Sequence, residues 1–235
     1  MQRSITFGLL VLALFVAPAL ALDPPDAKVN PQNSHIETAH VSWTGSAYVV
    51  RHSDDDGSEP PETTTLETCA SFCDGARIEI STAGDTWEVW WRDGSVAEVV
   101  SRKLAYGGSW GSTRVLSEDD EDSRNSEISR FGSQTWVVFE AEQSGGTGVA
   151  VNVIIDDPDP IGTRVILRTT AYSGDVDSQI RNESGHLWVT WVDSGTQVGW
   201  SEYASGSWSS PAYESYSGST IATARARIRV HVLGL

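Results

Sequence analysis

Short runs of apolar residues alternate with polar ones along most of the chain, and clusters of turn residues separate the runs. Examples are "TWEVWW" at 86–91, "VAEVVSRK" at 96–103 and "STRVLS" at 112–117, which are rich in β-branched and aromatic residues. The segments "RDGS", "EQSGGTG" and "DSGTQ" between such runs have the composition of hairpin turns. No stretch beyond residue 21 shows helical periodicity, so the pattern predicts an all-β fold.

The runs also form a repeat of about 50 residues. Three similar segments begin with tryptophan, 49 and 52 residues apart: "WEVWWRDG" at Trp87, "WVVFEAEQSGG" at Trp136 and "WVTWVDSG" at Trp188. A second aromatic residue follows three positions later in each segment, at Trp90, Phe139 and Trp191. Four short strands in a repeat of this length are typical of a β-propeller blade. Because the tryptophans recur in register, we expect Trp136 and Trp188 to be core residues.

The repeats divide the chain into blades at about 76–125, 126–177 and 178–225. A partial unit at 39–75 contains "HVSWTGSAYVVRH", in which Trp43 matches Trp191, but no first strand precedes it. The segment "ARIRVHVLGL" at 226–235 resembles "ARIEI" at 76–80 and has the pattern of a first strand. We therefore expect residues 22–38 to be an N-terminal extension and residues 39–235 to be a four-bladed propeller. Residues 226–235 would complete its first blade. The alternative is an open fragment of a larger propeller.

The N-terminus has the features of a signal peptide over residues 1–21. Arg3 precedes an apolar run from Ile5 to Val16, and Ala19-Leu20-Ala21 is a small-residue cleavage site. This predicts a secreted or periplasmic protein with no membrane span in the mature chain. In the oxidising compartment that export implies, Cys69 and Cys73 are expected to form a local disulfide.

The negative net charge of the chain argues against nucleic acid as its partner. The chain has 16 Lys and Arg against 32 Asp and Glu, a formal net charge of −16. Such a surface repels phosphate backbones, so nucleic acid is not expected as a partner. A glycan or an extracellular protein is the expected ligand.

Acidic loops and two unmatched tryptophans are the candidate ligand-binding residues. With the strands of a blade named A to D from the axis outward, the D–A and B–C loops share the face on which propellers usually bind ligands. We expect ligand contacts there from Asp93, Asp119, Asp120, Asp122, Asp175, Asp177, Asp193, Trp91 and Trp200. The acidic loops have three explanations: solvation of an exported protein, calcium binding at Asp119, Asp120 and Asp122, or carboxylate pairs for glycoside chemistry.

The combination of "HLWVTW", a hairpin and "SGSWSSP" resembles the sialidase-like (BNR, or Asp-box) propellers. The resemblance covers residues 76–214 and, more weakly, 40–68. The family's turn motif is Ser-x-Asp-x-Gly-x-Thr-Trp, of which Ser109-Trp110 and Ser207-Trp208 keep the last part, whereas Ala105 and Tyr203 lie where the aspartate would fall. The resemblance implies a propeller fold in a secreted, glycan-associated context. No residues are assigned to the arginine triad, the Tyr–Glu pair or the acidic proton donor of that family.

These observations favour an exported binding propeller that recognises a glycan or protein through its D–A and B–C loops. A sialidase-like glycoside hydrolase or lyase is the first alternative, and a structural or assembly module is the second. The degenerate Asp boxes favour binding over catalysis, because fold alone does not carry an activity. No cofactor other than calcium is expected.

Overall fold

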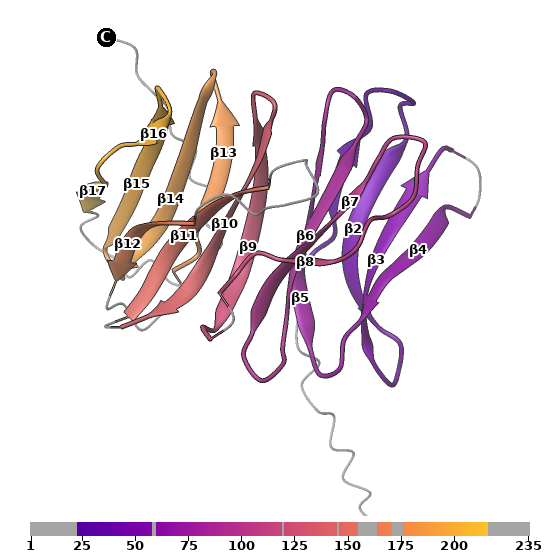
Figure 1. Ribbon diagram of the computed structural model, residues 1–235, viewed down its shortest axis with the longest axis horizontal. Coiled ribbons are helices and arrows are strands. Elements are labelled where there is room, and N and C mark those ends of the chain that lie inside the picture. Colours follow the sequence, from indigo (N-terminus) through magenta and orange to yellow (C-terminus); the bar gives the residue numbers. More distant parts are fainter. Residues whose placement is uncertain are drawn as a thin grey trace, which may run out of the picture.

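The computed structural model describes residues 23–57, 60–118, 120–144, 146–154, 164–170 and 176–215. These residues contain strands and no helix, as the alternating pattern predicted. They form four antiparallel sheets, each made from one contiguous stretch of chain and ordered as the chain runs. The result is an all-β, propeller-like architecture with one sheet per blade (Figure 1).

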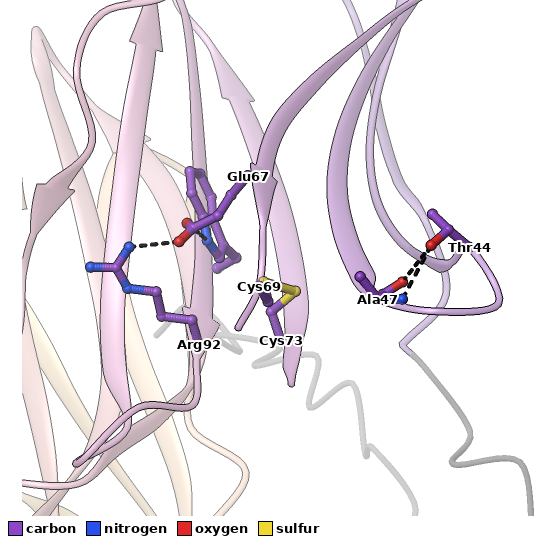
Figure 2. Close-up of a disulfide and its surroundings, with 7 residues drawn as sticks. Thr44, Ala47, Glu67, Cys69, Cys73 and Arg92 are labelled. Atoms are coloured by element: carbon purple, nitrogen blue, oxygen red, sulfur yellow. Dashed lines mark hydrogen bonds and ion pairs between the residues drawn. A yellow bond between two sulfur atoms is a disulfide. The ribbon is translucent and has the colours of Figure 1, made fainter. Parts of the chain in front are cut away.

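The first two sheets come from residues 26–115. The first contains β1 (Asp26–Val29), β2 (Ile36–Trp43), β3 (Tyr48–Asp55) and β4 (Glu62–Thr68). The second contains β5 (Cys73–Ile80), β6 (Thr86–Arg92), β7 (Glu98–Leu104) and β8 (Arg114–Val115). A disulfide joins Cys69, just after β4, to Cys73 at the start of β5, which confirms the predicted pairing (Figure 2).

The third and fourth sheets come from residues 123–215. The third contains β9 (Ser123–Phe131), β10 (Gln134–Gln143), β11 (Gly146–Ile154) and β12 (Val165–Thr170). The fourth contains β13 (Gln179–Glu183), β14 (His186–Ser194), β15 (Gln197–Ala204) and β16 (Ser207–Trp208), and β17 (Ala212–Ser215) also pairs with β15. In Figure 1 the first and fourth sheets lie at opposite sides of the view.

Three buried apolar clusters hold consecutive sheets together. One lies between the first and second sheets, one between the second and third, and one between the third and fourth. The recurring aromatic residues form their centres: Trp90, Phe139 and Trp191 are fully buried, and Trp87 and Trp136 are 1% and 5% exposed. The core role expected for Trp136 is therefore confirmed.

The same expectation is wrong for Trp188, which is only partly buried. Leu187, Val189 and Trp191 on β14 pack against the third sheet. Because successive side chains in a strand point to opposite faces, Trp188 lies on the other face of the fourth sheet. Among the described residues, no apolar cluster covers that face.

The first blade differs from the prediction at its inner edge. Strand β1 pairs with β2, from Asp26 opposite Ala39 to Val29 opposite Ile36, and β3 takes the other edge of β2. The place that we assigned to residues 226–235 is thus filled by the chain's own N-terminal strand, and the blade begins at Asp26 rather than at residue 39. Residues 226–235 lie outside the described part of the chain, so any pairing by that segment stays a prediction.

The match of Trp43 to Trp191 is also wrong. Trp43 ends β2 and is 53% exposed, whereas Trp191 is fully buried. The residues of β2 that pack against the second sheet are instead Ala39 and Val41.

A buried polar cluster lies between the first two sheets. Nδ1 of His52 on β3 is 2.7 Å from Oε1 of Glu88 on β6, and its Nε2 is 4.0 Å from Oε2 of Glu37 on β2. Glu37 also accepts hydrogen bonds from Asn30 and Thr86. All five residues are less than 5% exposed.

In the described chain, no helix is long and apolar enough to cross a membrane.

Candidate functional site: a polar pocket between the inner strands

The innermost strands of all four sheets line one cavity with a volume of about 1010 Å³. Strands β1, β5, β9 and β13 each contribute to its wall, and four residues outside these strands also line it: Pro24, Pro25, Thr82 and Gly132. Propeller ligands are expected at such a place because it is the concave surface on which all blades converge.

Strand alternation explains why this wall is polar. Ile78, Ile128 and Ile180 belong to the apolar clusters between the sheets. The neighbouring positions of each inner strand therefore carry polar side chains that line the cavity, in two tiers. The first tier is Asp26, Arg77, Glu127 and Gln179, which pair with Ala39, Val89, Val138 and Thr190 of the adjoining strands. The second tier is Lys28, Glu79, Ser129 and Arg181, which pair with Glu37, Trp87, Trp136 and Trp188.

Arg77 organises the first tier. Its guanidinium lies 2.9 Å from Asp23 through Nη2 and 2.9 Å from Glu127 through Nε. Asp26 accepts a hydrogen bond of 3.0 Å from the backbone N–H of Ile78. Burial raises the pKa of Glu127, and the charge of Arg77 and its hydrogen bond offset only part of that rise. The negative charge of Asp26 raises the pKa of Glu127 further.

The two cations of the second tier, Lys28 and Arg181, differ in whether they pair with a carboxylate. Lys28 lies 3.7 Å from Glu79, whose pKa is raised by burial and only partly lowered by the charge of Lys28. Arg181, by contrast, makes no hydrogen bond or ion pair with any other residue in the described ranges, although its charge acts on Glu127.

Arg130 also lines the cavity. Its guanidinium lies 5.2 Å from the ring centre of Trp87 and donates a hydrogen bond of 3.1 Å to the carbonyl of Ser133. The pocket therefore combines four cations with four carboxylates, those of Asp26, Glu79, Glu127 and Glu183. Such a wall can bind hydroxyl and acidic groups of a polar ligand at the same time.

Three of the residues predicted from the sequence lie together on the D–A and B–C loop side. The guanidinium of Arg124 lies 5.5 Å from the ring centre of Trp91, 3.9 Å from Asp93 and 3.7 Å from Asp122. Asp122 also accepts a hydrogen bond of 2.7 Å from the backbone N–H of Ala97.

The other predicted residues do not join this group. Asp193 pairs with Arg168 at 3.0 Å, and the backbone N–H of Asp177 donates to Glu140. Trp200 lies on β15 opposite Thr190 and Ala212. Asp120 is exposed on a loop.

Asp119 and Asp175 lie outside the described residues. Within the described residues, no three His, Cys, Asp or Glu side chains are arranged to hold a metal ion. The calcium site at Asp119, Asp120 and Asp122 therefore stays a prediction.

Sequence reasoning looked for the site on loops and missed the inner strands. A signal was present, because charged residues alternate with isoleucine in "ARIEI" and follow it in "SQIRNE". Charged side chains are rarely buried in the core of a sheet, so their presence in inner strands indicates a polar cavity beside them.

Comparisons with known proteins find likeness in structure only. No protein-family model matches the chain, and no curated protein matches its sequence. The fold is similar to the crystal structure of a thermostable family-43 glycoside hydrolase, with a TM-score of 0.54 and 10% identity over 83% of this chain and 74% of that one. It is also similar to an ulvan lyase of polysaccharide lyase family PL25, with a TM-score of 0.54 and 10% identity over 79% of this chain and 56% of that one. At this level of identity the likeness establishes the fold.

Proposed function

We propose that this chain is an exported carbohydrate-binding propeller that holds an acidic glycan in the pocket between its inner strands. The observation that carries the proposal is the concentration of cations there. Four of the 16 Lys and Arg residues of a chain with net charge −16 line this one cavity: Lys28, Arg77, Arg130 and Arg181. Arg181 has no hydrogen-bond or ion-pair partner among the described residues, and such a guanidinium is suited to a carboxylate or sulfate group of a ligand.

The fold and the resemblance support a carbohydrate ligand. Both structural neighbours act on saccharides by their titles, and both share the fold of this chain. The disulfide between Cys69 and Cys73 supports export, because such bonds persist in oxidising compartments.

In the proposed complex, the acidic group and the hydroxyl groups of the ligand contact different residues of the pocket. The acidic group lies against Arg181, while hydroxyl groups donate to the carboxylates of Glu79 and Asp26 and accept from Gln179. Charge-assisted hydrogen bonds of this kind are stronger than neutral ones, and they are less screened in a cavity than on an open surface. The local cations also offset the repulsion that the acidic surface exerts on an anionic ligand.

Isothermal titration with two probes tests the proposal. Oligogalacturonides carry a carboxylate on every sugar, and cello-oligosaccharides of the same length are neutral. We expect the wild-type protein to bind the acidic series more tightly, and Arg181→Gln to remove this preference. Arg168→Gln, an arginine on β12 outside the pocket, is the control and should keep it. Equal binding of both series by the wild-type protein, or no binding of either, would contradict the proposal.

Glycoside hydrolysis is the second candidate, and the carboxyl groups of the first tier favour it. Glu127 is partly buried with a raised pKa, which is the property of a general acid, and Asp26 supplies a second carboxyl group that accepts a hydrogen bond from the backbone N–H of Ile78. A panel of acidic and neutral oligosaccharides, analysed for new reducing ends, tests this candidate. Cleavage that Glu127→Gln and Asp26→Asn both abolish would replace the binding proposal by a catalytic one.

A further inference from the structure

Four aromatic side chains form a continuous row on the D–A and B–C loop side of the first two sheets. The ring centres of Trp43 and Tyr48 are 4.8 Å apart, those of Tyr48 and Phe72 are 4.7 Å apart, and those of Phe72 and Trp91 are 5.3 Å apart. The residues come from both ends of the β2–β3 turn, from the loop between β4 and β5, and from β6. We call them the aromatic row.

The loops that carry the aromatic row are fixed in place. Thr44 and Ala47 close the β2–β3 turn with hydrogen bonds of 3.1 and 3.2 Å, and the Cys69–Cys73 disulfide closes the loop that contains Phe72 (Figure 2). The backbone N–H of Cys69 donates to Tyr48, and that of Asp93 donates to Phe72, each at 2.9 Å. The row is therefore presented by a rigid backbone, which lowers the entropy cost of binding a ligand.

The outer end of the row is open to solvent. Trp43 is 53% exposed, and Tyr48, Phe72 and Trp91 are partly exposed. Trp43 contacts Tyr48, and the row continues from there through Phe72 to Trp91. Exposed aromatic side chains grouped in this way are typical of contact sites.

The inner end of the row lies beside the pocket. Trp91 packs so closely on Gly75 that a Cβ atom there would lie 3.1 Å from Cδ1 of the indole. The same point is 3.9 Å from Oδ2 of Asp23, which pairs with Arg77 of the first tier. The aromatic row thus begins next to the wall of the pocket and ends at Trp43.

We infer that the aromatic row binds the part of a polysaccharide chain that extends beyond the pocket. This inference rests on the proposed function and adds that the ligand is long. The C–H groups of a pyranose ring pack well on an aromatic face, and tilted rings in series can contact successive sugars. Arg124, Asp93 and Asp122 lie around Trp91 and supply hydrogen bonds to sugar hydroxyls or acidic groups.

Titration of short and long ligands against two matched variants tests the inference. Trp43→Ala removes the exposed end of the row, and Tyr106→Ala removes a similarly exposed aromatic residue, 49% against 53%, that is not part of the row. The probes are a galacturonate dimer and a galacturonate octamer. We expect the wild-type protein to bind the octamer about tenfold more tightly than the dimer, a difference of about 1.4 kcal/mol. Trp43→Ala should lose this gain without weakening the dimer, and Tyr106→Ala should keep it.

The outcomes separate this inference from the proposed function. If the dimer and octamer bind equally, or if Trp43→Ala keeps the gain, the row is not a glycan surface while the pocket proposal stands. If neither probe binds to the wild-type protein, both proposals are wrong. Analytical sedimentation tests whether the row instead binds a second copy of the chain. In that case the wild-type protein would self-associate and Trp43→Ala would not, while Trp43→Ala would bind the octamer as tightly as the wild-type protein does.

Discussion

The buried indole of Trp191 determines which residue can stand opposite it on β15. Its indole is fully buried in the cluster between the third and fourth sheets, and it lies against Gly199 on β15. A Cβ atom at position 199 would overlap the indole ring. The residue opposite Trp191 in the strand pair must therefore be glycine, a requirement that follows from packing rather than from an unusual backbone angle.

We expect Gly199→Ala to lower the free energy of unfolding by roughly 1–3 kcal/mol, the usual cost of overpacking a core. Urea denaturation followed by tryptophan fluorescence measures it. Gly111→Ala is the control, because a Cβ atom there would be 3.4 Å from the nearest atom, the carbonyl oxygen of Lys103. Equal stability of Gly199→Ala and the wild-type protein would show that the indole can move.

Trp136 and Trp188 occupy the same position in their repeats but differ in how deeply they are buried. Trp136 is 5% exposed between two sheets, whereas Trp188 occupies the same repeat position on a face that no described sheet covers. We expect Trp136→Ala to cost about 3–5 kcal/mol of stability and Trp188→Ala less than half as much. Thermal denaturation of the two variants under one set of conditions gives the comparison. Equal losses would mean that another part of the protein covers Trp188.

At the scale of elements, the first two sheets are held together by buried charged and polar side chains as well as by apolar packing. Burial raises the pKa of Glu88 to about 7, although the hydrogen bond from His52 opposes the rise. For His52, burial lowers the pKa, but the hydrogen bond and charge of Glu88, together with the charges of Glu37 and Asp54, outweigh that effect and the net pKa is raised. Glu37, Asp54 and Asp26 add negative charge around the pair. The cluster therefore holds protons more tightly when the protein is folded than when it is unfolded.

This cluster should make the protein less stable as the pH rises. Glu88 binds its proton in the folded state up to about pH 7 but only up to about pH 4.5 when unfolded, so its contribution to stability falls through that window. The raised pKa of His52 acts in the same direction above pH 6.5. We expect Glu88→Gln, which resembles the protonated side chain, to flatten the decline in unfolding free energy between these values. Glu62→Gln, on an exposed position of β4, should leave the wild-type slope, and an unchanged slope in Glu88→Gln would contradict the assignment.

The sequence was most informative about elements that repeat. Periodicity and recurring tryptophans predicted the strands of the second, third and fourth sheets, because the second strand of each sheet is mostly buried and carries the repeated aromatic residues. Strand β1 was missed because "DAKV" has only four residues and follows two prolines, so it has neither the length nor the apolar content of the other inner strands. The pocket was missed for a related reason: its residues come from four strands, and only the assembled sheets show that they face one cavity.

At the scale of the whole molecule, each blade is built from its own stretch of chain. This arrangement makes the first blade dependent on β1, which covers an edge of β2 that would otherwise offer unpaired backbone groups. We expect removal of residues 22–29 to lower the melting temperature and to promote association through β2. Removal of residues 226–235 should leave the pairing of β2 unchanged. Differential scanning calorimetry with sedimentation distinguishes the two truncations, and a monomer of unchanged melting temperature after the first would contradict the role of β1.

Charge is distributed unevenly over the described part of the molecule. The chain has twice as many acidic as basic residues, whereas four cations and four carboxylates of its inner strands line a single cavity. The central claim is that this cavity, rather than the loops alone, holds an acidic glycan.

A crystal structure of the protein soaked with an oligogalacturonide tests that claim most directly. The account predicts a sugar between β1, β5, β9 and β13, with a carboxylate within hydrogen-bond distance of Arg181. A ligand bound elsewhere, with the cavity between the four inner strands filled only by water, would contradict it.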